Sequence, residues 1–138
     1  MIRLATPTDI PRIFEIRDSV CENRLTNPEA VTADDVARFV DGGALWVWQE
    51  AGGLVTGFSA ADARDGSVWA LFVAPEHEGK GIGRALLSRA CDALRDAGHR
   101  VATLSTDPGT RAERHYRAAG WVVVGENAKR ELVFQKPL

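Results

Sequence analysis

The chain has 138 residues, with 17 basic and 19 acidic side chains and a net charge of −2. Its 45% hydrophobic and 26% charged residues are typical of one globular domain, residues 1–138, and exclude a disordered tail, a collagen and a disulfide scaffold. The near-neutral charge also lacks the basic excess of a dedicated nucleic-acid binder, so no nucleic-acid partner is expected.

The expected compartment is the cytoplasm, with no membrane partner. No apolar run approaches the roughly 20 residues that cross a bilayer, and the first residues lack a signal-peptide pattern. Cys21 and Cys91 are then expected to be reduced thiols. Neither cysteine has a metal-ligand spacing and the three histidines form no close pair, so no metal site is expected.

Hydrophobic periodicity and turn signals divide the chain into short elements without a repeat or a linker. After an apolar start come two helices, three successive strands, a long helix, a strand, a helix and two closing strands. The expected strands are residues 2–4, 44–49, 54–61, 67–73, 101–104, 121–124 and 131–134. The helices are expected to open at Pro7, Thr32, Ile82 and Thr110. The order β-α-α-β-β-β-α-β-α-β-β predicts a mixed α/β or α+β fold with a layered core.

The segment before the long helix carries the most information. Gly79, Gly81 and Gly83 fall within five residues and let backbone amides approach a ligand closely. They lead into a helix N-terminus, where amides without internal partners and the positive end of the macrodipole favour an anion. Lys80 and Arg84 add positive charge. A phosphate or pyrophosphate site is one interpretation of this segment, and a tight turn is the other.

Two stretches resemble the GNAT family of N-acetyltransferases, and the order of elements agrees over nearly the whole chain. The first stretch has Gly81 and Gly83 in the family's Arg/Gln-x-x-Gly-x-Gly/Ala motif, with Glu78 in place of the Arg or Gln. The second has Tyr116 and Gly120-Trp121, similar to the family's Tyr-x-x-x-Gly-Phe. The resemblance implies a mostly antiparallel sheet of about seven strands with helices on both faces, and acetyl-CoA as the cosubstrate.

The resemblance also implies roles for these residues. Tyr116 would be the general acid that protonates the departing thiolate, and the backbone amide of Phe72 would polarise the thioester carbonyl. Glu78 is expected to point outward, because a carboxylate facing a pyrophosphate would repel it. The residues implied to bind the cofactor are Leu71, Phe72, Val73, Glu78, Gly79, Lys80, Gly81, Ile82, Gly83 and Arg84.

The sequence defines the residues that act on the acetyl acceptor less closely than those that bind the cofactor. The general base could be Asp62, Asp65, Glu22 or His115, or a chain of water molecules. The first three carboxylates could also attract a cationic amine, so they are the candidate substrate-binding residues.

The row of Arg111, Arg114 and Arg117 follows helical spacing. It is either a solvated helix face or a contact for the 3′-phosphate of CoA.

The predicted function is transfer of an acetyl group from acetyl-CoA to a primary amine of a small molecule, by direct attack in a ternary complex. The alternatives are a non-catalytic acyl-CoA-binding or regulatory domain, and a protein or peptide acetyltransferase. By family analogy, the closing strands could also support a homodimer.

Overall fold

The computed structural model describes residues 1–20 and 32–138. Within them the predicted order of elements is confirmed, with two short 3-10 turns in addition, η1 (Pro7–Asp9) and η2 (Pro75–His77). The strands are β1 (Ile2–Leu4), β2 (Leu45–Gln49), β3 (Val55–Asp62), β4 (Ser67–Val73), β5 (Val101–Thr106), β6 (Val122–Glu126) and β7 (Leu132–Pro137). The helices are α1 (Ile10–Ser19), α2 (Ala33–Asp41), α3 (Ile82–Asp96) and α4 (Arg111–Ala118).

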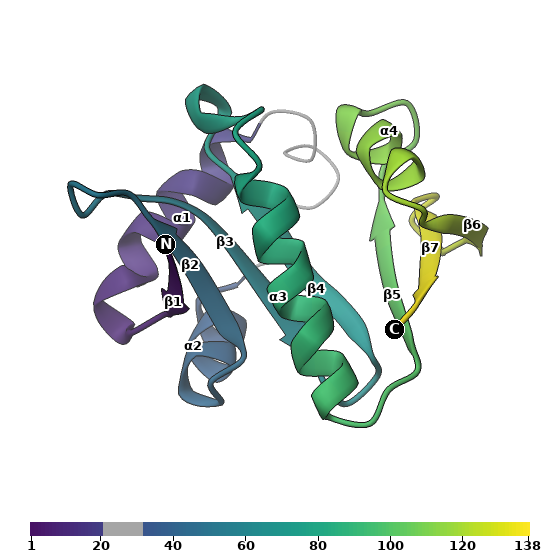
Figure 1. Ribbon diagram of the computed structural model, residues 1–138, viewed down its shortest axis with the longest axis horizontal. Coiled ribbons are helices and arrows are strands. Elements are labelled where there is room, and N and C mark those ends of the chain that lie inside the picture. The colour runs from purple at the N-terminus through teal and green to yellow at the C-terminus, as the bar shows by residue number, and fades with distance from the viewer. Residues whose placement is uncertain (21–31) are drawn as a thin grey trace.

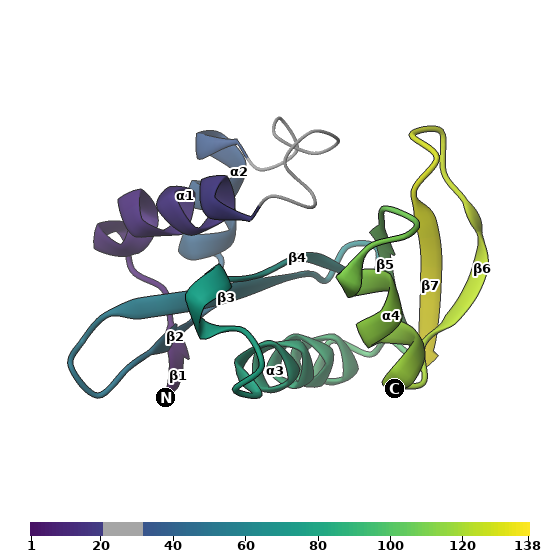
Figure 2. The same cartoon turned by 90° about the horizontal axis from the view of Figure 1, so that it is seen from above.

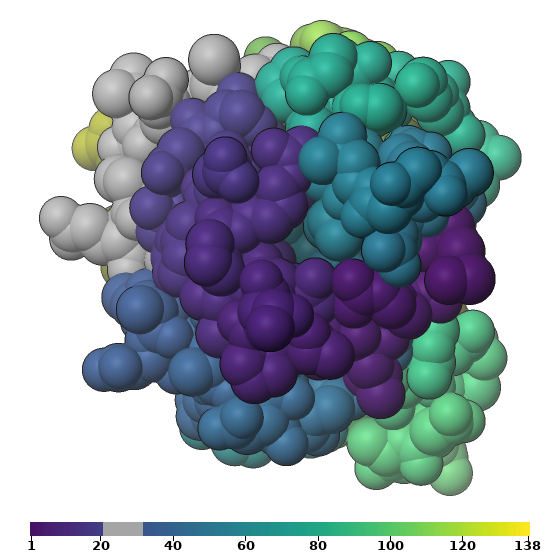
Figure 3. All heavy atoms as spheres, turned by 90° about the vertical axis from the view of Figure 1, so that its left-hand side faces the viewer, coloured from purple at the N-terminus to yellow at the C-terminus, as the bar shows by residue number. Residues whose placement is uncertain are grey.

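The strands form one sheet in the order β1-β2-β3-β4-β5-β7-β6. Neighbouring strands are antiparallel except β4 and β5, which are parallel (Figure 1). Figure 2 shows α1 and α2 on one face of the sheet and α3 on the other. The predicted mostly antiparallel sheet with helices on both faces is therefore confirmed. At the β1 side of the molecule, α1 lies between α2 and the β2–β3 hairpin (Figure 3).

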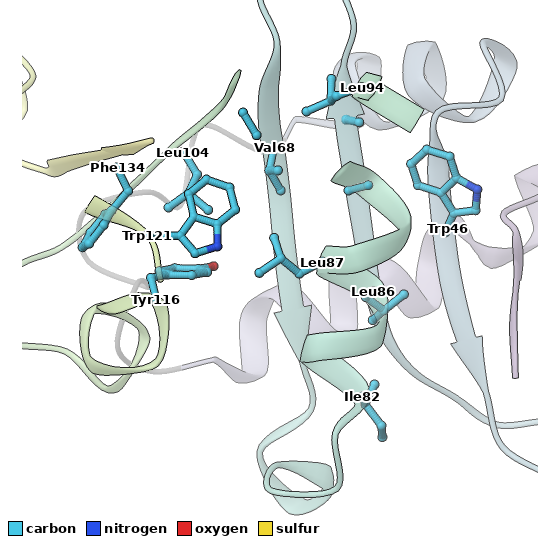
Figure 4. Packing of buried hydrophobic residues seen from close by; sticks show 13 residues of the cluster. Trp46, Val68, Ile82, Leu86, Leu87, Leu94, Leu104, Tyr116, Trp121 and Phe134 are labelled. Carbon is cyan, nitrogen blue, oxygen red and sulfur yellow. The ribbon is translucent and has the colours of Figure 1, made fainter. Parts of the chain in front are cut away.

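A hydrophobic core lies on each face of the sheet. On one face, Ile13 of α1 and Phe39 of α2 pack over Phe58 of β3. On the other face, α3 and α4 cover the sheet with a second cluster (Figure 4). Its members include Trp46, Leu86, Leu94, Tyr116, Trp121 and Phe134. Two layers of side chains therefore hold the sheet, and α3 belongs to the second layer.

Two strand tryptophans pack against the cores on opposite faces of the sheet, Trp46 buried and Trp69 partly buried. Trp46 is buried beneath α3, with the guanidinium of Arg89 4.9 Å from its ring centroid. Trp69 points to the opposite face, where its ring centroid lies 4.4 Å from that of Phe39.

Strands β5 and β7 are longer than periodicity predicted. They pair along their whole length, from Val101↔Pro137 to Thr106↔Leu132. Polar positions such as Gln135 and Lys136 enter the strand because each backbone group gains a partner there, which outweighs local propensity. Among the described residues no helix is long and apolar enough to cross a membrane.

Helix α3 lies directly against β3, and two small residues set its distance. The fully buried Ser59 donates its hydroxyl to the carbonyl oxygen of Leu86 at 3.0 Å. At Gly57, an added Cβ would lie 3.0 Å from Leu86 Cδ1 and 3.1 Å from the carbonyl oxygen of Phe72. The missing side chain at Gly57 therefore allows the first turns of α3 to approach the sheet.

We expect Gly57→Ala to lower the free energy of unfolding by about 1–3 kcal/mol, because the added methyl overpacks the contact with α3. Chemical denaturation measures the effect. Gly52→Ala is the matched control, since a Cβ at Gly52 has no neighbour within 4 Å, and it should change stability by no more than about 0.5 kcal/mol. Equal stabilities of the two variants would contradict this account of α3 placement.

Candidate active site

The site begins where the sheet opens. Strands β4 and β5 share only one residue pair, Ser67↔Thr103, and the amide of Thr103 donates to the carbonyl oxygen of Gly66 at 3.0 Å. Beyond this pair the two strands diverge (Figure 1). Beyond Ser67, the edge of β4 that faces β5 is therefore open. Backbone groups at such an edge need other hydrogen-bond partners, and an extended ligand can supply them.

The closed end of this opening is tightly packed. Gly66 has a φ of +75°, and a Cβ there would lie 2.9 Å from Nδ1 of His99. The other ring nitrogen of His99, Nε2, lies 2.6 Å from the carbonyl oxygen of Ala63, to which it donates. The imidazole therefore fills the space that a side chain at position 66 would take.

The register of β3 and β4 determines which amides face the opening. Ala74 donates its amide to the carbonyl oxygen of Thr56 at 2.8 Å, and hydrogen-bonded pairs recur every second residue along an antiparallel ladder. The pair Phe58↔Phe72 is therefore also hydrogen-bonded, which directs the Phe72 amide to β3.

The Phe72 amide, which the family resemblance implied would polarise the thioester carbonyl, therefore faces β3 and not the opening. In a strand, neighbouring residues direct their amides to opposite edges. Leu71 and Val73 therefore present their amides to the opening on the β5 side. The Phe72 side chain also faces the α1–α2 core, stacked on Phe58 with a centroid distance of 5.2 Å.

A pocket of about 330 Å³ joins this edge of β4 to the glycine loop and α4. It is the place where the sequence-predicted cofactor residues meet. The described lining consists of Val20, Leu71, Phe72, Val73, His77, Glu78, Gly79, Gly81, Ile82, Gly83, Arg84, Arg111, Ala112, His115 and Tyr116. Of the predicted cofactor residues, only Lys80 is missing from this lining.

The glycine loop has the conformation that an anion site requires. Gly79 and Gly81 have φ values of +80° and +82°, a left-handed region that favours glycine. Gly81 is the N-cap of α3 and no side chain caps the helix there. The first amides of α3 are thus open to the pocket, where the helix macrodipole favours negative charge.

Two charged side chains of the loop point in directions other than those expected from the sequence. Lys80 extends its Nζ to within 3.2 Å of His77 Nδ1 rather than into the pocket lining. Glu78 does not point outward, because its Oε2 accepts a hydrogen bond of 2.6 Å from Arg111 Nη1 of α4. The carboxylate near the loop is thus partly neutralised by a guanidinium from the far side of the pocket.

Tyr116 lies at the opposite wall of the pocket and is positioned by aromatic packing. Its ring centroid lies 6.0 Å from that of Trp121 and 5.9 Å from that of Phe134. Its hydroxyl end points toward α3 (Figure 4). Burial raises the pKa of the Tyr116 phenol well above its usual range, so the phenol keeps its proton at neutral pH.

The candidate acceptor residues are not gathered at the pocket. Asp62 pairs with Ser67 at the closed end of β4, and Arg64 binds its carboxylate at 2.8 Å. Asp65 accepts from the amide and the hydroxyl of Ser67, at 3.0 and 2.6 Å. Neither lines the pocket. Glu22 lies outside the described residues. Among the candidate bases that the structure describes, His115 alone lines the pocket.

Sequence reasoning missed three pocket residues, Val20, His77 and Ala112. The signal for His77 was its place two residues before the glycine loop. Its Nδ1 lies 3.4 Å from Oε1 of Glu50, which accepts a 3.1 Å hydrogen bond from Thr56. Nothing in the local sequence pairs the β2–β3 hairpin with this loop. Among the described residues, no cluster of three or more His, Cys, Asp or Glu could hold a metal ion.

Comparison with known proteins agrees with this geometry. The family model described as an acetyltransferase (GNAT) domain matches residues 41–123. The L-amino acid N-acyltransferase MnaT of Escherichia coli (strain K12) is 31% identical over 140 aligned residues, covering 91% of this chain and 81% of that protein.

Solved structures are similar over the whole chain. The Salmonella typhimurium protein yncA, solved with its cofactor acetyl-CoA, is 27% identical with a TM-score of 0.70, covering 100% of this chain and 93% of that one. A phosphinothricin acetyltransferase of Sinorhizobium meliloti, solved with acetyl-CoA, has the same fold, with a TM-score of 0.77, 21% identity and coverage of 100% and 88%. The chain therefore belongs to the GNAT family of acetyltransferases.

Proposed function

We propose that this chain transfers the acetyl group of acetyl-CoA to the primary amine of a small molecule, and that amino acids are the acceptors to test first. The observation that carries the proposal is a single pocket lined by the open edge of β4, the N-terminus of α3 and Tyr116. Similarity to an L-amino acid N-acyltransferase supports the choice of acceptor.

The glycine loop fits the phosphate end of the cofactor. The left-handed Gly79 and Gly81 leave the amides at the start of α3 open to the pocket, and a Cβ at either glycine would have no neighbour within 4 Å. These glycines therefore serve the backbone conformation rather than a close contact. Arg84, in the first turn of α3, also lines the pocket and adds positive charge beside a pyrophosphate.

The open edge of β4 fits the extended arm of the cofactor. When bound, acetyl-CoA supplies a thioester whose carbonyl carbon is attacked by the amine and whose sulfur leaves with the electron pair of the C–S bond. The amides of Leu71 and Val73 face the place where an added strand would pair. An amide fixed there donates to a carbonyl oxygen as negative charge develops on it, without reorganisation.

Tyr116 fits the role of proton donor to the leaving sulfur. Its buried phenol is neutral and its hydroxyl points toward α3, on the pocket side. Desolvation raises the proton affinity of a thiolate as well as that of the phenol, so a sulfur that leaves beside the buried phenol also binds a proton more tightly. The proton that the amine loses goes to His115 or to water, since His115 lines the pocket and the other described candidates, Asp62 and Asp65, do not.

A thiol-release assay with acetyl-CoA tests the proposal across L-amino acids, other small amines and short peptides. We expect release above the acceptor-free background with amino acids, and an N-acetylated product by mass spectrometry. Release with peptides alone would overturn the small-molecule acceptor. Failure to bind acetyl-CoA at millimolar concentration would overturn the proposed reaction.

We expect Tyr116→Phe to lower kcat by about 100-fold or more, because the variant lacks the proton for the thiolate but keeps the ring packing. The dissociation constant for acetyl-CoA should change little, and calorimetric titration measures it. An unchanged kcat would assign proton donation to another group.

A pH titration checks the state of the phenol directly, since Tyr116 is the only tyrosine in the chain. Burial raises its pKa in the folded protein, whereas in the unfolded chain it titrates near the ordinary value of about 10. The near-ultraviolet absorbance of phenolate should therefore be absent from the folded protein at pH 10 and present after unfolding.

The same shift affects stability. Above about pH 10 the unfolded chain releases a proton that the folded protein keeps, so folding stability falls as pH rises toward the folded pKa. Tyr116→Phe should remove this contribution. Phenolate formation near pH 10 in the folded protein would contradict the assignment.

A further inference from the structure

An acidic residue lies in the anion-binding segment. Glu78 directly precedes the left-handed glycines at the start of α3 and lines the pocket. Its carboxylate binds the guanidinium of Arg111, with 2.6 Å between Oε2 and Nη1. Both side chains are partly exposed, Glu78 at 35% and Arg111 at 59%, so a ligand in the pocket can reach them.

The pair crosses the opening of the sheet. Glu78 follows β4 through η2, and Arg111 is the first residue of α4, which follows β5. These are the two strands that diverge after Ser67↔Thr103. Arg111 therefore brings a guanidinium from the β5 side to the glycine loop, into the same pocket as the first turn of α3.

A carboxylate and a pyrophosphate compete for the position between the Arg111 guanidinium and the N-terminus of α3. Both are oxygen anions that a guanidinium binds, and both are favoured beside a helix N-terminus. Two like charges repel each other at close range, so they cannot share it. A pyrophosphate has more charge and more acceptor oxygens, and a guanidinium matches phosphate geometry with paired hydrogen bonds.

We propose that Glu78 holds Arg111 at the pocket as a substitute anion, and that the pyrophosphate of CoA takes Arg111 over when it binds. This inference rests on the proposed function and adds to it a binding residue on α4. Arg111 is then a direct ligand of the pyrophosphate, and Glu78 is a positioning residue that weakens cofactor binding in exchange for pre-orienting Arg111.

The test is a cycle of Glu78→Gln, Arg111→Gln and the double variant, titrated calorimetrically with CoA and with dephospho-CoA, which keeps the pyrophosphate but lacks the 3′-phosphate. Glu78→Gln should tighten CoA binding several-fold, because the competing carboxylate is gone. Arg111→Gln should weaken it by about tenfold or more. Arg111→Gln should still weaken binding in the Glu78→Gln background, and equally for dephospho-CoA.

Each contrary result overturns the inference. If Arg111→Gln has no effect in the Glu78→Gln background, Arg111 only neutralises the carboxylate. If Glu78→Gln weakens CoA binding, Glu78 is not a competitor. If the Arg111 effect is lost with dephospho-CoA, Arg111 contacts the 3′-phosphate instead.

Two matched controls exclude a general charge effect. Glu76→Gln removes an exposed carboxylate two residues from Glu78, and Arg95→Gln removes an exposed guanidinium in the last turn of α3. Neither residue lines the pocket, so both variants should bind CoA as the unmodified chain does. An unmodified chain that binds neither nucleotide would overturn the proposed function itself, a result distinct from any pattern within the cycle.

Discussion

The single residue pair between β4 and β5 is the constraint on which the site depends. Most neighbouring strands in the sheet pair over several residues, but β4 and β5 pair only at Ser67↔Thr103. On its other side, β5 is paired with β7 through six residue pairs, which give its backbone groups hydrogen-bond partners. β4 is left with an open edge inside the sheet rather than at its border. A ligand can pair with β4 there. Because this edge lies inside the sheet, it is less open than a border strand to pairing with another protein chain, which leads to aggregation.

Everything else in the site is arranged around that opening. α3 is fixed to β3 by the Ser59–Leu86 hydrogen bond and by the missing side chain at Gly57, which places its N-terminus beside the end of β4. α4 is fixed on the other side by the packing of Tyr116 against Trp121 and Phe134. The core on the α3 side of the sheet therefore determines where the anion site and the phenol lie, and Tyr116 belongs both to that core and to the pocket.

The sequence predicted the order of elements, the glycine loop and the tyrosine, because these depend on local periodicity and on short motifs. It failed where the answer depends on pairing between distant residues. The direction of the Phe72 amide follows from the register of β3 and β4, which no local pattern encodes. The partner of Glu78 is 33 residues away, on an element that only the fold brings to the loop. Asp62 is near β4 in sequence, yet the hairpin places it at the closed end, away from the pocket.

The packing at Gly66 and His99 has a mechanical consequence. The two halves of the sheet meet next to Gly66, and β4 and β5 diverge from this point. A small change in the angle between β4 and β5 at this point therefore gives a larger displacement at their far ends. The imidazole that fills the space beside Gly66 lies at the closed end of the two strands, opposite the gap between the glycine loop and α4. The width of the site thus depends on the angle between β4 and β5, at a point whose residues, Gly66 and His99, lie outside the pocket lining.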